Sequence, residues 1–71
     1  MLKTFNESLI YAKLEIELAN LVGSHATRIA CLTNAKGWMR AALAEANAMR
    51  DRKRAGLCLK TLHWLRLAVR S

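Results

Sequence analysis

The chain has 71 residues and a formal net charge of +7, with 54% hydrophobic residues, three glycines and no proline. This composition excludes a disordered chain, and it excludes a β-rich fold, which would need more turn-forming residues. A chain this short forms one domain, here residues 1–71, and buries only about 60% of the surface that its unfolded form exposes. We therefore expect an all-α domain, a small bundle of three main helices that self-associates to cover apolar surface.

The first helix is predicted to begin near Thr4 and to run to about Val22. Thr4 and Glu7 have the spacing of a capping box, Gly23 is expected to cap the C-terminus, and Ser24 is expected to start the next element. At about 100° per residue the helix has two apolar faces, so it needs two partners, either two helices of the bundle or one helix and another copy. The broad face holds Ile10, Leu14, Leu18, Leu21, Tyr11 and Val22, and a second strip holds Leu9, Ala12, Ile16 and Ala19.

The second segment, residues 25–54, is predicted to be one long helix. Its weak point is Asn34–Gly37, because glycine costs about 1 kcal/mol against alanine inside a helix and asparagine favours caps. A break there would leave two helices in place of one. The apolar residues recur at alternating steps of three and four, which predicts a seam against a neighbouring helix: Leu32, Ala35, Met39, Ala42, Ala46 and Met49.

Residues Arg54–Gly56 are predicted to turn the chain into a third helix, from about Leu57 to Arg70. Its apolar side holds Leu57, Cys58, Thr61, Leu62, Trp64, Leu65, Ala68 and Val69. The other side is a secondary basic face of Lys60, His63, Arg66 and Arg70. Leu59 and Leu67 project among these basic residues, and we expect them to form a protein interface together with Leu9 and Ile16 of the first helix.

The charge is concentrated in the second and third segments. Residues 1–24 carry two lysines and three glutamates, whereas residues 25–71 carry ten basic residues against Glu45 and Asp51. A stripe about 27 Å long is expected along the second helix, made of Lys36, Arg40, Asn47, Arg50 and Arg54 and extended by Arg52 and Lys53. Such a row suits the phosphates of DNA or RNA, since each contact releases a counterion and adds salt-dependent affinity.

Three other interpretations of the charge stay open. The stripe also suits an acidic protein surface. The chain would then be an inhibitor or adaptor that occupies an acidic or nucleic-acid-binding surface of a host protein complex. In size the chain resembles the small helical proteins of phages and mobile elements. The charge also serves solubility alone in many small proteins. A membrane-surface role is the least favoured, because a bundle core needs the same apolar side of the third helix.

Aromatic residues, acids and metal ligands give little support for catalysis. Trp38 is the aromatic side chain expected on the surface beside basic residues, whereas Trp64 and Tyr11 are assigned to packing. Neither Cys58 with His63 nor His25 with Cys31 has the spacing of a helical zinc pair. No phosphate loop or nucleophile elbow occurs, so we expect a non-enzymatic cytoplasmic protein with no cofactor or metal and with both cysteines reduced.

Overall fold

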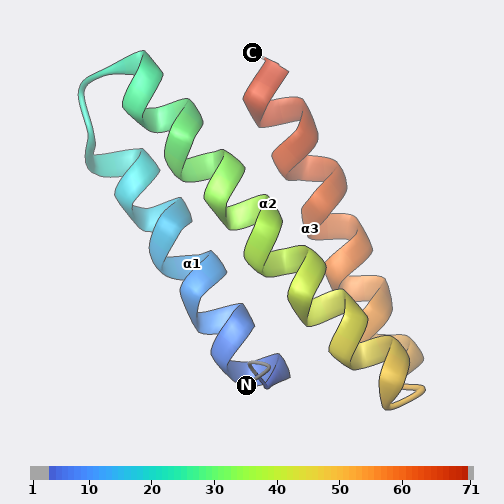
Figure 1. The fold of residues 1–71 in the computed structure, drawn as a ribbon. Coiled ribbons are helices and arrows are strands. Elements are labelled where there is room, and N and C mark those ends of the chain that lie inside the picture. Colours follow the sequence, from blue (N-terminus) through green and yellow to red (C-terminus); the bar gives the residue numbers. More distant parts are fainter. Residues whose placement is uncertain (1–3, 71) are drawn as a thin grey trace.

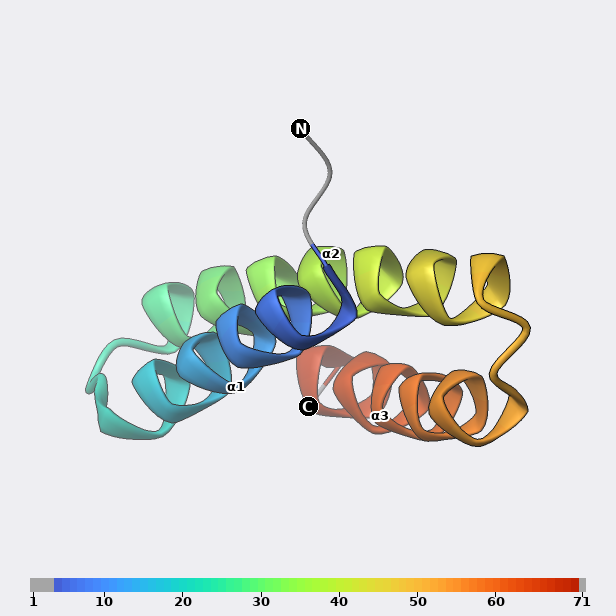
Figure 2. The same ribbon diagram turned by 90° about the horizontal axis from the view of Figure 1, so that it is seen from below.

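The computed structural model describes residues 4–70, which form three helices and no strand. The helices are α1 (Phe5–Leu21), α2 (His25–Ala48) and α3 (Arg52–Arg70). The longest helix, α2, lies in the middle, and α1 and α3 run antiparallel to it on either side (Figure 1). Viewed from below, α1 and α3 both lie beneath α2 (Figure 2). The bundle measures 38 × 24 × 14 Å, and the predicted all-α fold of three helices is confirmed.

The predicted seam on α2 is the centre of the core. Leu32, Ala35, Met39, Ala42 and Ala46 are all buried, and α3 meets them with Cys58, Leu62 and Leu65. From α1 come Phe5, Ala12 and Ala19. Alanines on both α1 and α2 allow the two helices to approach closely, so this part of the core relies on backbone proximity rather than on large side chains. Met49 at the end of the seam is exposed.

The orientation of α1 is a structural finding that the helical pattern left open. Its narrower strip faces α2, since Ala12 and Ala19 are buried and Leu9 and Ile16 pack partly buried against the core. The broad aliphatic face, which holds the larger side chains, is exposed to solvent at Ile10, Leu14, Leu18 and Leu21. The expectation that Leu9 and Ile16 form an external interface is therefore replaced by a role inside the fold.

Helix α2 passes through its weak point without a break. Residues Asn34–Gly37 are helical, and a Cβ atom added at Gly37 would meet nothing within 4 Å. Ser24 begins the helix as predicted, with its Oγ accepting from the amide of Thr27 at 3.4 Å. The preceding cap differs from the prediction. The C-cap of α1 is Val22 in an extended conformation, and Gly23 has no positive φ.

The N-terminus of α1 has the predicted capping box. Thr4 Oγ1 accepts from the amide of Glu7 at 3.2 Å, and the Glu7 carboxylate accepts from the amide of Thr4 at 3.4 Å. The two side chains also hydrogen-bond to each other at 3.0 Å. Two of the amides that lack an intrahelical partner at this end are thereby satisfied, which marks where the helix begins.

The turn between α2 and α3 lies at residues 49–51, five residues before the predicted one. Arg50 has a φ of 56°, and within residues 4–70 it is the one non-glycine residue with a positive φ. Its amide donates to Asn47 and the amide of Asp51 donates to Ala46, the two bonds of a Schellman motif. Asp51 then caps α3, accepting from the amide of Arg54 at 3.0 Å. The prediction of a turn at Arg54–Gly56 was wrong, because these residues lie in the first turns of α3.

No helix within residues 4–70 is both long enough and apolar enough to cross a lipid bilayer.

Candidate functional site

Three polar positions of α2 lie on one side of the helix. At about 100° per residue, Lys36, Arg40 and Asn47 fall within about 40° of one another. Arg40 and Asn47 are exposed, and Lys36 is half-buried. Arg40 lies about 160° around the helix from Trp38, whose ring stacks on Tyr11 of α1. These three side chains therefore lie on the side of α2 away from α1.

Three arginines of α3 form a matching row. Arg52, Arg66 and Arg70 lie within about 40° of one another, and all three are exposed. On both helices the polar row is rotated about the helix axis relative to the buried positions. The rotation is in the sense of increasing residue number on each helix. Because α2 and α3 run antiparallel, this displacement brings both rows to the same side of the pair.

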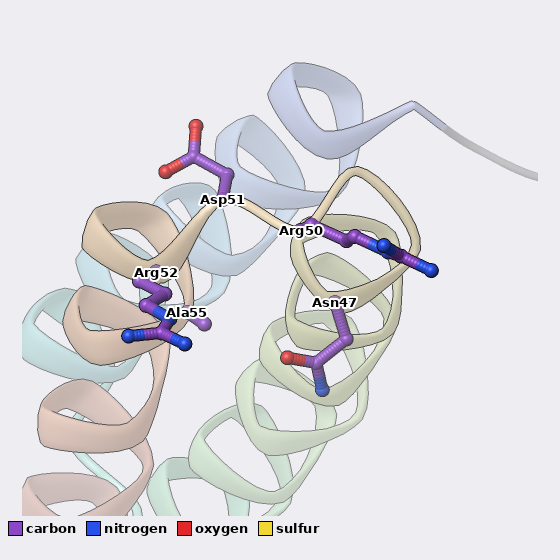
Figure 3. A pocket seen from close by; sticks show the side chains of 5 residues that line it. All are labelled: Asn47, Arg50, Asp51, Arg52 and Ala55. Carbon is purple, nitrogen blue, oxygen red and sulfur yellow. The ribbon is translucent and has the colours of Figure 1, made fainter.

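A pocket at the turn supports this placement. Asn47 of α2 and Arg52 and Ala55 of α3 line one open pocket of about 260 Å³, together with Arg50 and Asp51 of the turn (Figure 3). Arg50 has a left-handed backbone, and in Figure 3 its side chain extends to the side of the turn away from Arg52. We name the whole surface the basic face, and it consists of Lys36, Arg40, Asn47, Arg50, Arg52, Arg66 and Arg70.

Four of the five acidic residues lie away from this face, and the fifth, Asp51, lines the turn pocket. In Figure 3 the Asp51 side chain points away from the other four labelled side chains, and its carboxylate contacts Arg54 at 3.5 Å. Glu45 lies about 160° around α2 from Asn47. The remaining acids, Glu7, Glu15 and Glu17, are on α1. Among the described residues the basic face thus combines six cationic side chains with one carboxylate, that of Asp51, at its turn pocket.

Arg54 does not belong to the basic face, contrary to the predicted stripe. The prediction assumed that the second helix continues to residue 54, whereas α2 ends at Ala48 and Arg54 lies in α3. Its guanidinium contacts Asp51 and lies over the ring of Phe5, on the side of α3 toward α1. Arg54 contacts residues of α1 and of the turn at this end of the bundle, and we assign it no part in the candidate site.

The other predicted site residues of α3 divide between two sides. Lys53 and Lys60 lie about 20° apart, and Leu67 lies beside them on the side facing away from α2. His63 is exposed between this row and the arginines. Leu59 is exposed and lies between Arg52 and Arg66 on the basic face itself. The secondary basic face is therefore not one surface. Arg66 and Arg70 belong to the basic face. Residues 52, 59 and 66 are seven apart, so they share one side of α3 because this helix begins at Arg52.

The aromatic residues differ from expectation. Trp38 is partly buried against the core and stacks on Tyr11, with ring centroids 4.7 Å apart and planes at 24°. It lies on the side of α2 opposite to Arg40, so it is not placed to stack on a base held by the basic face. Trp64, assigned to packing, is half-exposed. A second open hollow, of about 440 Å³, adjoins the stacked pair and is lined by Glu15, Thr33, Asn34, Gly37, Trp38 and Ala41.

Both cysteines are free thiols in separate environments. Cys58 is buried, and burial raises the pKa of its thiol above the ordinary value. Desolvation also raises the pKa of the Cys31 thiol, and the charge and hydrogen bonding of Glu15 raise it further. Raised pKa values disfavour the thiolate, which is the nucleophilic and metal-binding form. No group of three metal-ligating side chains occurs among residues 4–70.

Comparison of the chain with protein-family models, with curated proteins and with solved structures finds no match.

Proposed function

We propose that the protein is a non-enzymatic nucleic-acid-binding protein that docks its basic face on the phosphate backbone of DNA or RNA. The observation that carries this proposal is the alignment of Arg40 and Lys36 on α2 with Arg52, Arg66 and Arg70 on α3. Two antiparallel rows of cations that share one side can follow a backbone of regularly spaced phosphates. Arginine also offers paired donors that match phosphate geometry.

The turn pocket supports the proposal independently of the charge count. A left-handed residue at this position of a Schellman motif is usually glycine, because a side chain there is strained. Arg50 occupies the position despite this cost and lines the turn pocket together with Asn47, Asp51 and Arg52. Residues in unfavourable backbone regions cluster at functional sites, where the strain is retained for the side chain. We infer that Arg50 is retained to supply a cation at the turn end of the basic face.

The test is binding of fluorescein-labelled single-stranded DNA, duplex DNA and RNA, followed by anisotropy between 50 and 200 mM KCl. Arg40→Ala and Arg66→Ala should each weaken binding and reduce the salt slope by about one unit. The matched controls Lys53→Ala and Lys60→Ala remove the same charge from other sides of α3. They should change the slope by much less.

Two outcomes would overturn the proposal. Equal losses in all four variants would mean that net charge attracts the nucleic acid without a defined face. No binding of any of the three probes at 50 mM KCl would remove nucleic acid as the partner.

An acidic protein surface is the second candidate, and the position of Leu59 favours it. This leucine is exposed in the middle of the basic face, where it offers nothing to a phosphate backbone. Interfaces between proteins combine such an apolar centre with a charged rim. Leu59→Ser separates the two candidates, because it should leave nucleic-acid affinity within about twofold and weaken a protein complex at least tenfold.

A further inference from the structure

The outer face of α1 carries a stripe of four large aliphatic side chains. Ile10, Leu14, Leu18 and Leu21 are 56%, 48%, 49% and 81% exposed. Their spacing of four, four and three residues places them on one side of the helix, opposite to the buried Ala12 and Ala19. We name these four residues the α1 stripe. Monomeric proteins rarely expose an apolar patch of this kind, and such a patch commonly marks an interaction surface.

We propose that the α1 stripe is the interface between two copies of this chain, with their α1 helices packed antiparallel about a two-fold axis near residue 15. A two-fold interface uses the same surface patch of both copies, so the stripe needs only a second stripe to cover it. In the antiparallel arrangement Ile10 of one copy lies near Leu21 of the second, and the two pairs of Leu14 and Leu18 lie at the centre.

Charge complementarity selects this arrangement. Lys13 and Glu17 are exposed along one edge of the stripe, about 40° apart. When two helices pack antiparallel, each edge meets the same edge of the other copy. Lys13 then lies opposite Glu17 of the second copy, and the two-fold axis generates the pair twice. Parallel packing would bring this edge against the opposite edge of the second copy and lose both pairs.

The charges of α1 disfavour other occupants of the stripe. Within Phe5–Leu21 the helix carries Glu7, Glu15 and Glu17 against one cation, Lys13. Helices that lie on anionic membranes have a strongly basic polar face, which α1 lacks. The same acidic balance repels nucleic acid. A second copy of this chain is the partner whose charges match those of α1.

The dimer leaves the basic face free, so this inference is independent of the proposed function. The stripe lies on the side of α1 opposite to the buried Ala12 and Ala19, and the basic face lies on the side of the α2–α3 pair away from α1. Two copies joined through α1 would therefore present two basic faces pointing apart. A dimer of this kind would bind two segments of nucleic acid at once, a consequence that rests on the proposed function.

The first test is the mass in solution, measured by sedimentation equilibrium between 5 and 200 µM. We expect a dimer of about twice the 8.0 kDa chain mass, with Leu14→Glu/Leu18→Glu reducing it to a monomer that keeps its helical circular dichroism. The matched control is Leu59→Glu/Leu67→Glu, which places two acids on similarly exposed leucines of α3. It should remain a dimer. A monomeric wild-type chain, or a dimer that survives the α1 variant, would overturn the inference.

The second test addresses the antiparallel pairing without disturbing the apolar stripe. Lys13→Glu alone and Glu17→Lys alone each turn both charge pairs into repulsions, so each homodimer should weaken about tenfold. An equimolar mixture of the two variants restores both attractive pairs and should form a heterodimer of wild-type affinity. A mixture no tighter than its components would exclude this arrangement of the α1 helices.

Discussion

The guanidinium of Arg54 lies over the ring of Phe5, with its central carbon 5.1 Å from the ring centroid. This contact joins the first residue of α1 to the first turn of α3, two helices that otherwise pack on α2 and not on each other. The same guanidinium contacts Asp51, the residue that caps α3. One side chain therefore connects α1, α3 and the turn between α2 and α3.

Replacement of Arg54 by methionine should lower the free energy of unfolding by about 0.5–1.5 kcal/mol. The variant loses the interaction of the cation with the Phe5 ring and the ion pair with Asp51, both of which are partly exposed. Urea denaturation followed by circular dichroism measures the change. Lys53→Met is the control, since it removes an adjacent exposed cation, and an equal loss in that variant would mean that the Phe5 contact contributes nothing.

Replacement of Arg50 by glycine should separate stability from binding. Glycine adopts a positive φ without strain, so the free energy of unfolding should rise by about 0.5–1 kcal/mol. The same variant removes a cation from the turn pocket, and its affinity for nucleic acid should fall. Thermal unfolding and the anisotropy titration measure the two effects. A loss of stability would show that the Arg50 side chain supports the fold rather than a ligand.

Replacement of Gly37 by alanine should raise the free energy of unfolding by about 1 kcal/mol. The residue is exposed in the interior of α2, and the added Cβ atom meets nothing within 4 Å. The reverse change, Ala44→Gly at an exposed position of the same helix, should lower stability by a similar amount. Denaturant midpoints of the two variants test the pair. An unchanged midpoint for Gly37→Ala would indicate that α2 is not continuous in solution.

Replacement of Ala42 by leucine should lower the free energy of unfolding by about 1–3 kcal/mol. Ala42 is fully buried in the seam of α2, where closely packed helices leave no room for a larger side chain. Ala44→Leu adds the same atoms on the exposed side of α2 and should be nearly neutral. If both variants have the stability of the wild-type chain, the helices are further apart than the buried alanines indicate.

Replacement of Glu15 by glutamine should speed the alkylation of Cys31 by iodoacetamide at pH 8. The carboxylate of Glu15 helps to raise the pKa of this thiol, so its removal lowers the pKa and increases the thiolate fraction. Mass spectrometry follows the rate at each cysteine separately, and the buried Cys58 should stay slow in both proteins. Glu17→Gln, on another side of α1, should leave the rate at Cys31 unchanged.

The parts of the fold that the sequence predicts correctly are those with local or periodic determinants. Thr4 with Glu7 and Ser24 mark helix starts through hydrogen bonds within one turn of chain. The α2 seam is correct because its period alone identifies the buried side. The second turn was misplaced because the left-handed position holds Arg50, whereas Gly56, the usual turn residue, lies within a helix.

Sequence periodicity could not predict which face of α1 is buried, and the reason is different. Both faces are apolar, so the choice depends on which one fits the α2 surface. The alanines of α2 accept the small residues Ala12 and Ala19, and the larger side chains then remain outside. The candidate site was found only in part for a related reason. The predicted stripe of the second helix and the predicted secondary basic face of the third helix form one surface only when the turn lies at residues 49–51. The position of this turn sets the register of α3 against α2.

The central position of α2 has a consequence for how the chain folds. Each of its two neighbours in space is also its neighbour along the chain, so the bundle consists of two helical hairpins that share one helix. Such a topology has few contacts between distant parts of the sequence, and proteins of this kind fold within microseconds to milliseconds. Because α1 and α3 share, among the described residues, only the contact of Arg54 with Phe5, we expect local opening of one outer helix to disturb the other less than it disturbs α2.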